Sequence, residues 1–260
     1  MIDTHCHLTD PRLFEQLPGV LARCAKERVT EMVTIGTDLE DDRAAIELCR
    51  KLPNVRCAVG IHPNYTSEAR VEDVAIVREL QNDPMVVAIG EMGLDYHYDR
   101  ATPAHQRGMF ETQLELAQEV GKPVVIHCRE AVDDTLAVMK SFAEVPAVFH
   151  CFTGTRDEAR RIVEAGYLLG FTGVITFKKN DELREIVKET PMDRILVETD
   201  APYLTPEPMR KIKTNEPSFV VHTARVVAEV KGVSYDEIDR ITTENARRFY
   251  RWHGPLARAQ

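Results

Sequence analysis

The sequence predicts an α/β protein with the fold of a (β/α)₈ TIM barrel, in which eight parallel strands alternate with helices and close into a cylinder. Its 260 residues are close to the roughly 250 that a complete barrel needs, so we expect one domain over residues 1–260. Short apolar segments rich in β-branched residues alternate with stretches of helical periodicity. Histidines and carboxylates stand at the ends of these segments, where such barrels carry their active sites.

The apolar segments are the predicted strands. They cover residues 1–8, 31–37, 55–63, 85–93, 123–128, 147–152, 167–173 and 195–202. Strands separated by helices of ten to fifteen residues imply parallel crossover units, and eight such strands close a barrel. An open, doubly wound sheet is the alternative, because periodicity alone does not distinguish the two. No GxGxxG or GxxxxGK[ST] motif follows a strand, so the usual nucleotide-binding loops are absent.

The helices are predicted from apolar stripes that end at glycine. Residues 106–120 carry such a stripe and stop at Gly121, where a left-handed residue ends a helix well. Residues 157–165 and 219–230 follow the same pattern, ending at Gly166 and Gly232. Residues 203–217 contain three prolines and are predicted to form a long loop after the last strand.

Composition excludes several classes of protein. Hydrophobic residues make up 43% and charged residues 29%, as in an ordinary globular protein. No run approaches the ~20 apolar residues that span a bilayer, and the N-terminus has no secretory signal. Six widely spaced cysteines favour a reducing, cytoplasmic location. The net charge of −9 and the lack of a basic stripe argue against binding along the phosphates of a long duplex. No feature of the sequence indicates an obligate protein partner.

Six side chains at strand ends predict a metal centre. Alternate residues of a strand share a face, so His5 and His7 project together while Cys6 points away. Glu91, His127, His150 and Asp200 end four further strands, and all ends of parallel strands meet on one rim. The alternative is that these are ordinary polar residues. Against it, five of the nine histidines lie at strand ends, namely His5, His7, His62, His127 and His150, while His97, His105, His222 and His253 fall in loops or helices.

The ligand types indicate which metals the centre takes. Nitrogen and carboxylate donors suit Zn²⁺, Mn²⁺, Ni²⁺ or Fe²⁺ better than an all-oxygen Mg²⁺ or Ca²⁺ cage. Six ligands exceed the three that one catalytic zinc usually takes, so we expect two divalent cations per chain, with Zn²⁺, Mn²⁺ and Mg²⁺ all kept open. Glu91 is the expected bridge between them. Strand parity places the thiols of Cys6, Cys128 and Cys151 outward, toward the helices.

Further residues near the same rim are candidates for substrate contacts. His62 is expected to donate a hydrogen bond to a phosphate or to protonate a leaving oxygen, or else to cap the loop at Pro63. Arg129 is expected to clamp a phosphate oxygen, or to pair with Glu130 or Asp133. Tyr203 is a candidate for stacking on a base, with packing beneath the long loop as the alternative. Asp3 and Glu198 lie one layer deeper and are expected to orient the ligands.

A set of motifs resembles a known family. In order they are DTHCHL, GIHP, GEMGLDY, PVVIHCREA, HCFTG, GVITF, ETDAPYLTP and NEP, running from residue 2 to about residue 250. Together they resemble the TatD family of metal-dependent deoxyribonucleases within the amidohydrolase superfamily. The resemblance implies a barrel of the metallo-dependent hydrolase type and hydrolysis of phosphodiester bonds in DNA. It also implies 3′→5′ exonuclease action on single-stranded DNA, with RNA as a further substrate.

The resemblance also implies how the ligands divide. His5, His7, Glu91 and Asp200 would surround one ion, and Glu91, His127 and His150 the other. The two cations would share and activate a water molecule, whose proton Asp200 accepts unless it acts only as a ligand. Asp200, Glu91 and His62 are thus the expected catalytic residues. Two departures from the family pattern, His97 and the stretch 210–214 before NEP, lie in expected substrate loops.

Two other functions stay open on the sequence alone. A bridging hydroxide attacks carbonyl carbon as readily as phosphorus, so hydrolysis of an amide, lactone or aminoacyl ester is the first alternative. A non-enzymatic protein that uses the metal-filled barrel to bind a partner is the second.

Overall fold

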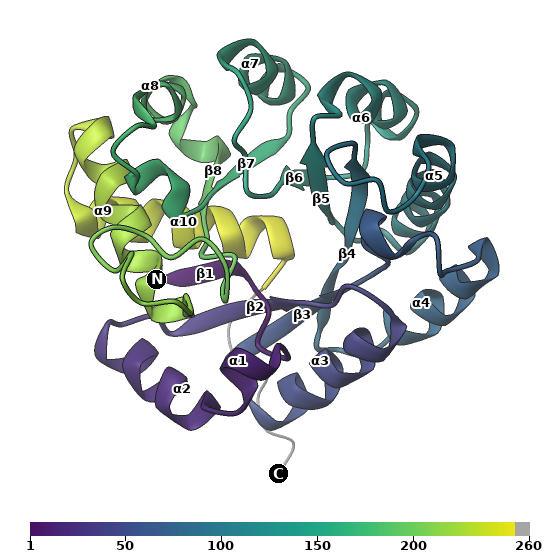
Figure 1. Ribbon diagram of the computed structural model, residues 1–260, viewed down its shortest axis with the longest axis horizontal. Coiled ribbons are helices and arrows are strands. Elements are labelled where there is room, and N and C mark those ends of the chain that lie inside the picture. Colours follow the sequence, from purple (N-terminus) through teal and green to yellow (C-terminus); the bar gives the residue numbers. More distant parts are fainter. Residues whose placement is uncertain (253–260) are drawn as a thin grey trace.

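A single eight-stranded sheet forms the centre of the computed structural model, which describes residues 1–252 (Figure 1). The strands follow one another in chain order and every neighbouring pair is parallel. Their bounds are β1 (Ile2–Cys6), β2 (Glu31–Ile35), β3 (Val55–Val59), β4 (Val86–Asp95), β5 (Val124–Arg129), β6 (Ala147–Phe149), β7 (Leu168–Phe171) and β8 (Ile195–Val197). This order is that of a (β/α)₈ barrel and excludes the open, doubly wound sheet.

The barrel closes where the chain after β8 meets the end of β1. Cys6 and Ala201 form a parallel bridge, and the His7 amide donates to the Ala201 carbonyl at 2.8 Å. The Asp200 amide donates to the His5 carbonyl at 2.9 Å. The backbone bonds that close the barrel are therefore made by His5, His7 and Asp200, three of the predicted metal ligands.

The helices form a ring around the sheet (Figure 1). Their bounds are α1 (Pro11–Phe14), α2 (Leu17–Lys26), α3 (Leu39–Lys51), α4 (Val74–Leu80), α5 (Pro103–Val120), α6 (Val132–Met139), α7 (Arg156–Glu164), α8 (Asp181–Glu189), α9 (Val220–Lys231) and α10 (Tyr235–Tyr250). Gly121 and Gly232 end α5 and α9 in the left-handed conformation, as predicted. No helix within residues 1–252 is long and apolar enough to cross a membrane.

One end of the barrel is covered by α10. Phe249, Tyr250 and Trp252 pack against inward-facing apolar residues of the strands. Arg247 pairs with Glu31 at the start of β2 at 3.0 Å, which places the helix under the N-terminal end of the sheet. The opposite rim, at the C-terminal ends of the strands, is left for the functional site.

Several strands end earlier than the sequence predicts. The segment 147–152 contains a strand only over Ala147–Phe149, and 195–202 only over Ile195–Val197. Left-handed residues interrupt the regular strand conformation after these ends, with φ of 47° at Cys151 and 56° at Asp200, although Ala201 still bridges to Cys6. The predicted helix 106–120 begins earlier, because Thr102 caps it and Pro103 starts it. Residues 203–216 form no helix or strand, in agreement with the predicted loop.

Candidate metal centre

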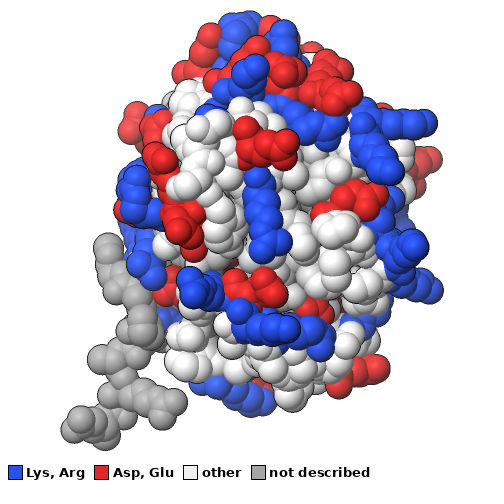
Figure 2. All heavy atoms as spheres, turned by 90° about the vertical axis from the view of Figure 1, so that its left-hand side faces the viewer, with Lys and Arg blue, Asp and Glu red and all other residues white. Residues whose placement is uncertain are grey.

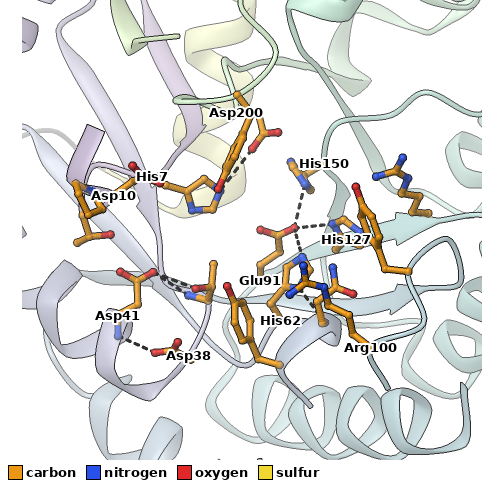
Figure 3. Close-up of a pocket in the computed structure, with 18 residues that line it drawn as sticks. His7, Asp10, Asp38, Asp41, His62, Glu91, Arg100, His127, His150 and Asp200 are labelled. Carbon is orange, nitrogen blue, oxygen red and sulfur yellow. Dashed lines mark hydrogen bonds and ion pairs between the residues drawn. The ribbon is translucent and has the colours of Figure 1, made fainter. Parts of the chain in front are cut away.

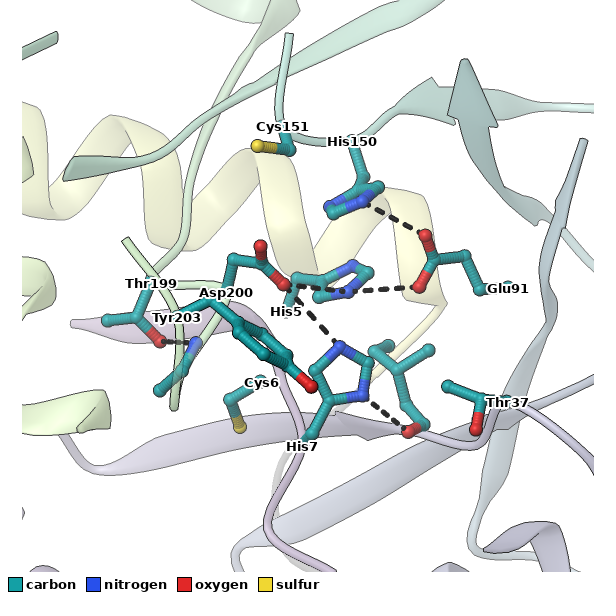
Figure 4. Close-up of polar contacts among 12 residues, drawn as sticks. His5, Cys6, His7, Thr37, Glu91, His150, Cys151, Thr199, Asp200 and Tyr203 are labelled. Atoms are coloured by element: carbon teal, nitrogen blue, oxygen red, sulfur yellow. Dashed lines mark hydrogen bonds and ion pairs between the residues drawn. The ribbon is translucent and has the colours of Figure 1, made fainter. Parts of the chain in front are cut away.

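The six predicted metal ligands lie together at the C-terminal rim of the barrel (Figures 3 and 4). They come from five strands or from the residues directly after them: His5 and His7 at β1, Glu91 in β4, His127 in β5, His150 after β6 and Asp200 after β8. All except His5 also line a pocket of about 560 Å³ that opens on this rim. The convergence predicted from strand parity is thus present in the geometry.

Glu91 lies at the centre of this cluster. Its Oε2 lies 3.4 Å from His5 Nε2, whereas its Oε1 lies 2.9 Å from His127 Nδ1 and 3.0 Å from His150 Nε2. Burial raises the pKa of the carboxylate, but the surrounding imidazoles, that of His150 first, outweigh burial and hold the pKa well below its usual range. An ionised carboxylate therefore presents one oxygen to each side of the centre.

Asp200 faces the histidines of β1. Its Oδ1 lies 3.4 Å from His7 Nε2 and 3.8 Å from His5 Nε2 (Figure 4). Burial raises the pKa of Asp200, yet its hydrogen bond with His7 and the nearby imidazoles lower it overall. The same contact outweighs burial at His7 and raises the pKa of that imidazole.

Three of the histidines have one ring nitrogen held by an acceptor outside the centre. His7 Nδ1 donates to the Ile35 carbonyl at 3.1 Å. His127 Nε2 lies 2.9 Å from Asp95, and His150 Nδ1 lies 3.2 Å from Glu198. The other nitrogen of each ring faces Glu91 or Asp200. A histidine that donates to an outer acceptor and turns its second nitrogen inward is typical of metal ligation.

His5 provides the test of whether a metal fits. The ring is fully buried, and neither of its nitrogens has a hydrogen-bond partner in the described part of the chain. Buried polar atoms nearly always have partners, and burial lowers the pKa of His5, which favours the neutral imidazole that binds metals. A divalent cation between Nε2 and the carboxylates of Glu91 and Asp200 would satisfy this nitrogen and neutralise the buried charge. The donor set fits a divalent metal.

The closest groupings of donor atoms differ in detail from the predicted sets. Within residues 1–252, donor atoms lie within 4.8 Å of one another in three groups: His5, His7 and Asp200; His5, His150 and Glu198; and His62, Glu91 and His127. The first group belongs to one predicted set. In the third, His62 stands where the prediction has His150.

His62 nevertheless has the wrong tautomer for a ligand. Its Nδ1 accepts a hydrogen bond from the Asn64 amide at 3.0 Å, so a neutral ring carries its hydrogen on Nε2. Burial lowers the pKa of His62 to about 3, which keeps the ring neutral. Nε2 points toward Glu91 Oε1, 3.5 Å away. The ring caps the turn at Pro63 with one nitrogen and offers a donor to the pocket with the other.

The deeper carboxylates have two different roles. Glu198 accepts from the Cys151 amide at 2.6 Å as well as contacting His150, so it orients a predicted ligand as expected. The Asp3 carboxylate has no hydrogen bond or ion pair with an imidazole of residues 1–252. It accepts from the Thr199 hydroxyl at 2.6 Å and the Thr199 amide at 2.9 Å, and so fixes the backbone that leads to Asp200.

Sequence reasoning missed Asp95. This buried carboxylate contacts His127 and accepts from the backbone amides of His97 at 3.0 Å and Tyr98 at 3.1 Å. Burial raises its pKa, but His127 and the amides outweigh burial and lower the pKa to about 2. The spacing to Glu91 was a usable signal, because residues four apart on a strand share a face.

The cysteines beside the histidines point elsewhere (Figure 4). Cys6 Sγ donates to the Val33 carbonyl, and Cys128 Sγ lies 3.4 Å from Thr135 in α6. Burial raises the pKa of Cys128 and of Cys151 to about 12, so both thiols stay protonated. No cysteine belongs to the donor groups of residues 1–252.

The predicted substrate residues lie at the mouth of the pocket. Among residues 1–252 Arg129 makes no salt bridge, because Glu130 pairs with His97 at 2.7 Å and Asp133 with Arg161 at 2.7 Å. Tyr203 is 48% exposed, so it does not pack beneath the loop, and the Arg12 guanidinium lies 4.6 Å from its ring centroid.

The two departures from the family pattern lie outside the centre. His97 is exposed in its pair with Glu130. The stretch 210–214 is half-buried or exposed, and Arg210 lies over the Phe177 ring at 4.1 Å. The neighbouring Asn215 is fully buried and donates to the carbonyls of Thr199 and Tyr203, so it supports the loop after β8. His105 is exposed and His222 is partly buried, both in helices, and His253 lies outside the described residues.

Comparison with known proteins identifies the family. The model of the TatD related DNase family matches residues 2–251. The uncharacterized metal-dependent hydrolase YabD of Bacillus subtilis is 40% identical over 253 residues, covering 96% of this chain and 99% of that protein. The 3′-5′ ssDNA/RNA exonuclease TatD of Edwardsiella piscicida is 36% identical over 258 residues, covering 96% and 99%.

Solved structures agree with this match. The crystal structure of the TatD homologue YjjV from Escherichia coli superimposes with a TM-score of 0.91 at 26% identity, covering 96% of this chain and 98% of that one. The eight-stranded barrel, the buried histidine–carboxylate cluster on its rim and these matches lead to one conclusion. The chain belongs to the TatD-related DNase family and is a metal-dependent hydrolase.

Proposed function

We propose that this hydrolase cleaves phosphodiester bonds of DNA with two divalent metal ions, removing nucleotides from the 3′ end of single strands. The observation that supports this most is the position of Glu91, whose two oxygens face different histidines across the centre. Metal pairs at a separation of ~3.5–4 Å act on phosphodiesters in many nucleases. The name of the Edwardsiella relative, a 3′-5′ ssDNA/RNA exonuclease, supports the substrate and extends it to RNA.

The chain offers ligands for each ion. His5, His7 and Asp200 would hold one ion, His127 and His150 would hold the other, and Glu91 would contribute a ligand to both. Zn²⁺ and Mn²⁺ suit these donors best, and Mg²⁺ is a further candidate. When bound, the ions supply a hydroxide near neutral pH and offset the negative charge of the scissile phosphate.

The remaining roles belong to the chain itself. Asp200 is the group placed to accept the proton of the attacking water, through the carboxylate oxygen that does not face His7. His62 is neutral and donates a hydrogen bond from Nε2 to a phosphate oxygen, which favours this role over that of a general acid. Arg129 binds a phosphate of the strand, and Tyr203 stacks on a base.

The charge distribution favours binding of a few nucleotides at the end of a nucleic acid strand over binding along a duplex. Acidic and basic side chains are interspersed on the face shown in Figure 2, and the net charge is −9. Long-range attraction along a duplex would require a basic stripe. Binding by the metal ions and a few arginines is sufficient for a single-stranded end. The six cysteines are free, as in a reducing compartment, so we include cytoplasmic location in the proposal.

The direct test uses single-stranded DNA labelled at either end, incubated with the purified chain and Mn²⁺ or Mg²⁺, with and without EDTA. Stepwise loss from the 3′ end that EDTA abolishes is the expected result. Intact DNA together with turnover of a carboxylic ester or lactone panel would overturn the proposal. Glu91→Gln, purified in parallel, must lose the activity, and this excludes a contaminating nuclease.

A further inference from the structure

Three side chains at one edge of the pocket form a cluster of two guanidinium groups and a ring. Tyr98 and Arg100 come from the loop after β4, and Arg129 ends β5. The Arg129 guanidinium carbon lies 4.9 Å from the Tyr98 ring centroid, and that of Arg100 lies 5.9 Å from it. All three line the pocket that His127, His150 and Asp200 also line.

Neither arginine is neutralised. Within residues 1–252, the guanidinium groups of Arg100 and Arg129 form no ion pair and no hydrogen bond, whereas most arginine side chains of this acidic chain are paired, as those of Arg23, Arg50 and Arg247 are. The carboxylates near Arg129 are engaged elsewhere: Glu130 with His97, Asp133 with Arg161 and Asp134 with the Tyr96 hydroxyl. Two exposed cations at the mouth of a functional pocket, without counter-ions, are available to an anionic ligand.

The opposite wall of the pocket is acidic. Figure 3 shows Asp10, Asp38 and Asp41 on one side and Arg100 on the other. The Arg12 guanidinium neutralises Asp10 at 2.7 Å, so the charge of this wall comes from Asp38 and Asp41, which have no salt bridge within residues 1–252. Asp38 accepts from amides at the start of α3 and Asp41 from the Thr37 amide, so both carboxylates are fixed in place. A polyanion at the metal centre is repelled by this wall and attracted toward the arginines.

We propose that Tyr98, Arg100 and Arg129 bind the phosphate adjacent to the scissile one, so that the strand leaves the metal centre across the loops after β4 and β5. This rests on the proposed nuclease function. A ring beneath a guanidinium holds the cation without an opposing charge, and leaves its N–H donors free for phosphate oxygens. The site therefore recognises a nucleic acid strand of at least two phosphates rather than a small phosphodiester.

The test compares Arg100→Gln and Arg129→Gln with the wild type and with Arg43→Gln. Arg43 is an exposed arginine of α3 that donates only to the Leu39 carbonyl. Anisotropy of a labelled single-stranded oligonucleotide in EDTA gives the Kd without cleavage. We expect each pocket variant to raise the Kd roughly tenfold and to reduce the slope of log Kd against log salt by about 0.7, the value per phosphate contact on single strands. Arg43→Gln leaves both unchanged.

Turnover with metal provides a second readout. The fall in kcat/KM should be at least about tenfold larger for the oligonucleotide than for bis(p-nitrophenyl) phosphate, which has one phosphate. Tyr98→Phe keeps the ring and should retain binding, whereas Tyr98→Leu should lose it. Unchanged Kd and salt slope in both arginine variants would overturn the subsite, as would equal losses on both substrates. A wild type that binds the oligonucleotide but cleaves neither substrate refutes the nuclease function instead.

Discussion

Asp95 connects a metal-facing histidine with the loop that carries the arginine cluster. Its Oδ2 contacts His127 Nε2 at 2.9 Å, and its Oδ1 accepts from the Tyr98 amide. A carboxylate on the outer nitrogen fixes the tautomer of a ligating histidine and raises its basicity. One side chain therefore positions both a proposed ligand and a proposed substrate residue.

Replacing Asp95 by asparagine tests this role. We expect Asp95→Asn to weaken metal binding about 10–100-fold, the usual effect of losing such an outer carboxylate. Titration of the EDTA-treated protein with Zn²⁺ against a chelating dye measures the affinity. Asp99→Asn, the same change at an exposed neighbour, serves as the control. Equal affinities for Asp95→Asn and wild type would show that His127 needs no such partner.

Asp42 in α3 is another buried carboxyl group, and no imidazole is among its hydrogen-bond or ion-pair partners within residues 1–252. Its Oδ1 accepts from the Gly60 amide at 3.1 Å, while Oδ2 has no hydrogen-bond partner among the residues that the structure describes. Burial raises the pKa well above the ordinary 3.8. A carboxyl group whose pKa rises on folding stabilises the folded state while protonated. That contribution is lost as the pH rises from the unfolded-state pKa through the folded-state value.

Asp42→Asn should therefore be more stable than wild type at neutral pH. We expect a gain on the order of 1 kcal/mol at pH 7 that shrinks as the pH falls toward about 4, because the wild-type carboxyl then becomes protonated. Urea unfolding across this range measures the difference. Asp99→Asn, the control, should leave the free energy of unfolding unchanged at every pH. A variant less stable than wild type at pH 7 would contradict the argument.

The residues that sequence reasoning found are those whose position follows from a strand. His5, Glu91 and His127 lie within strands, so parity and the common rim suffice to bring them together. Arg100 and the tautomer of His62 depend on loop conformation. The His62 tautomer is set by the amide of Asn64, two residues later in the same loop. Such contacts within a loop leave no periodic pattern in the sequence.

At the level of elements, all eight predicted strands are present, and the errors concentrate at their C-terminal ends. The sequence predicts strands over 147–152 and 195–202, whereas regular strand conformation ends at Phe149 and Val197. The left-handed turns at Cys151 and Asp200 cause this, and neither residue type marks such a turn reliably. The site could be located from the sequence although its local backbone could not.

Two glycines provide a matched test of how elements position the site. Gly93 in β4 has a φ of 136°, and a Cβ there would lie 2.0 Å from the His127 carbonyl oxygen in β5. Gly108 in α5 has open space around a Cβ. We expect Gly93→Ala to destabilise the fold by about 3 kcal/mol or more. We expect Gly108→Ala to stabilise it by about 0.5–1 kcal/mol.

Denaturant unfolding of both variants measures whether each substitution lowers or raises the free energy of unfolding. Gly93→Ala should also weaken metal binding, because the strain falls on the backbone of His127. A Gly93→Ala variant as stable as wild type would show that β4 can move away from β5 without cost, and that their pairing does not fix the centre.

At the scale of the molecule, the barrel is plugged at its N-terminal end, whereas near its open C-terminal rim the sheet closes between β1 and the chain after β8. The N-terminal end is filled by Phe249, Tyr250 and Trp252, an apolar plug. The junction of β1 with β8 at the other end relies on few backbone bonds, together with the side chains of His5, His7 and Asp200. A metal held by these three would join the first and last strands of the sheet.

Metal should therefore stabilise the whole fold as well as enable catalysis. An ion that binds only the folded chain, present at 100 times its Kd, adds about 2.7 kcal/mol, or roughly 5–10 °C in Tm for a chain of this size. Differential scanning fluorimetry of protein dialysed against EDTA and then given Zn²⁺ or Mn²⁺ measures the shift. Glu91→Gln should lose most of it, whereas Glu47→Gln, an exposed glutamate of α3, should keep it. Equal Tm values with and without metal would mean that the ions do not stabilise the closed barrel.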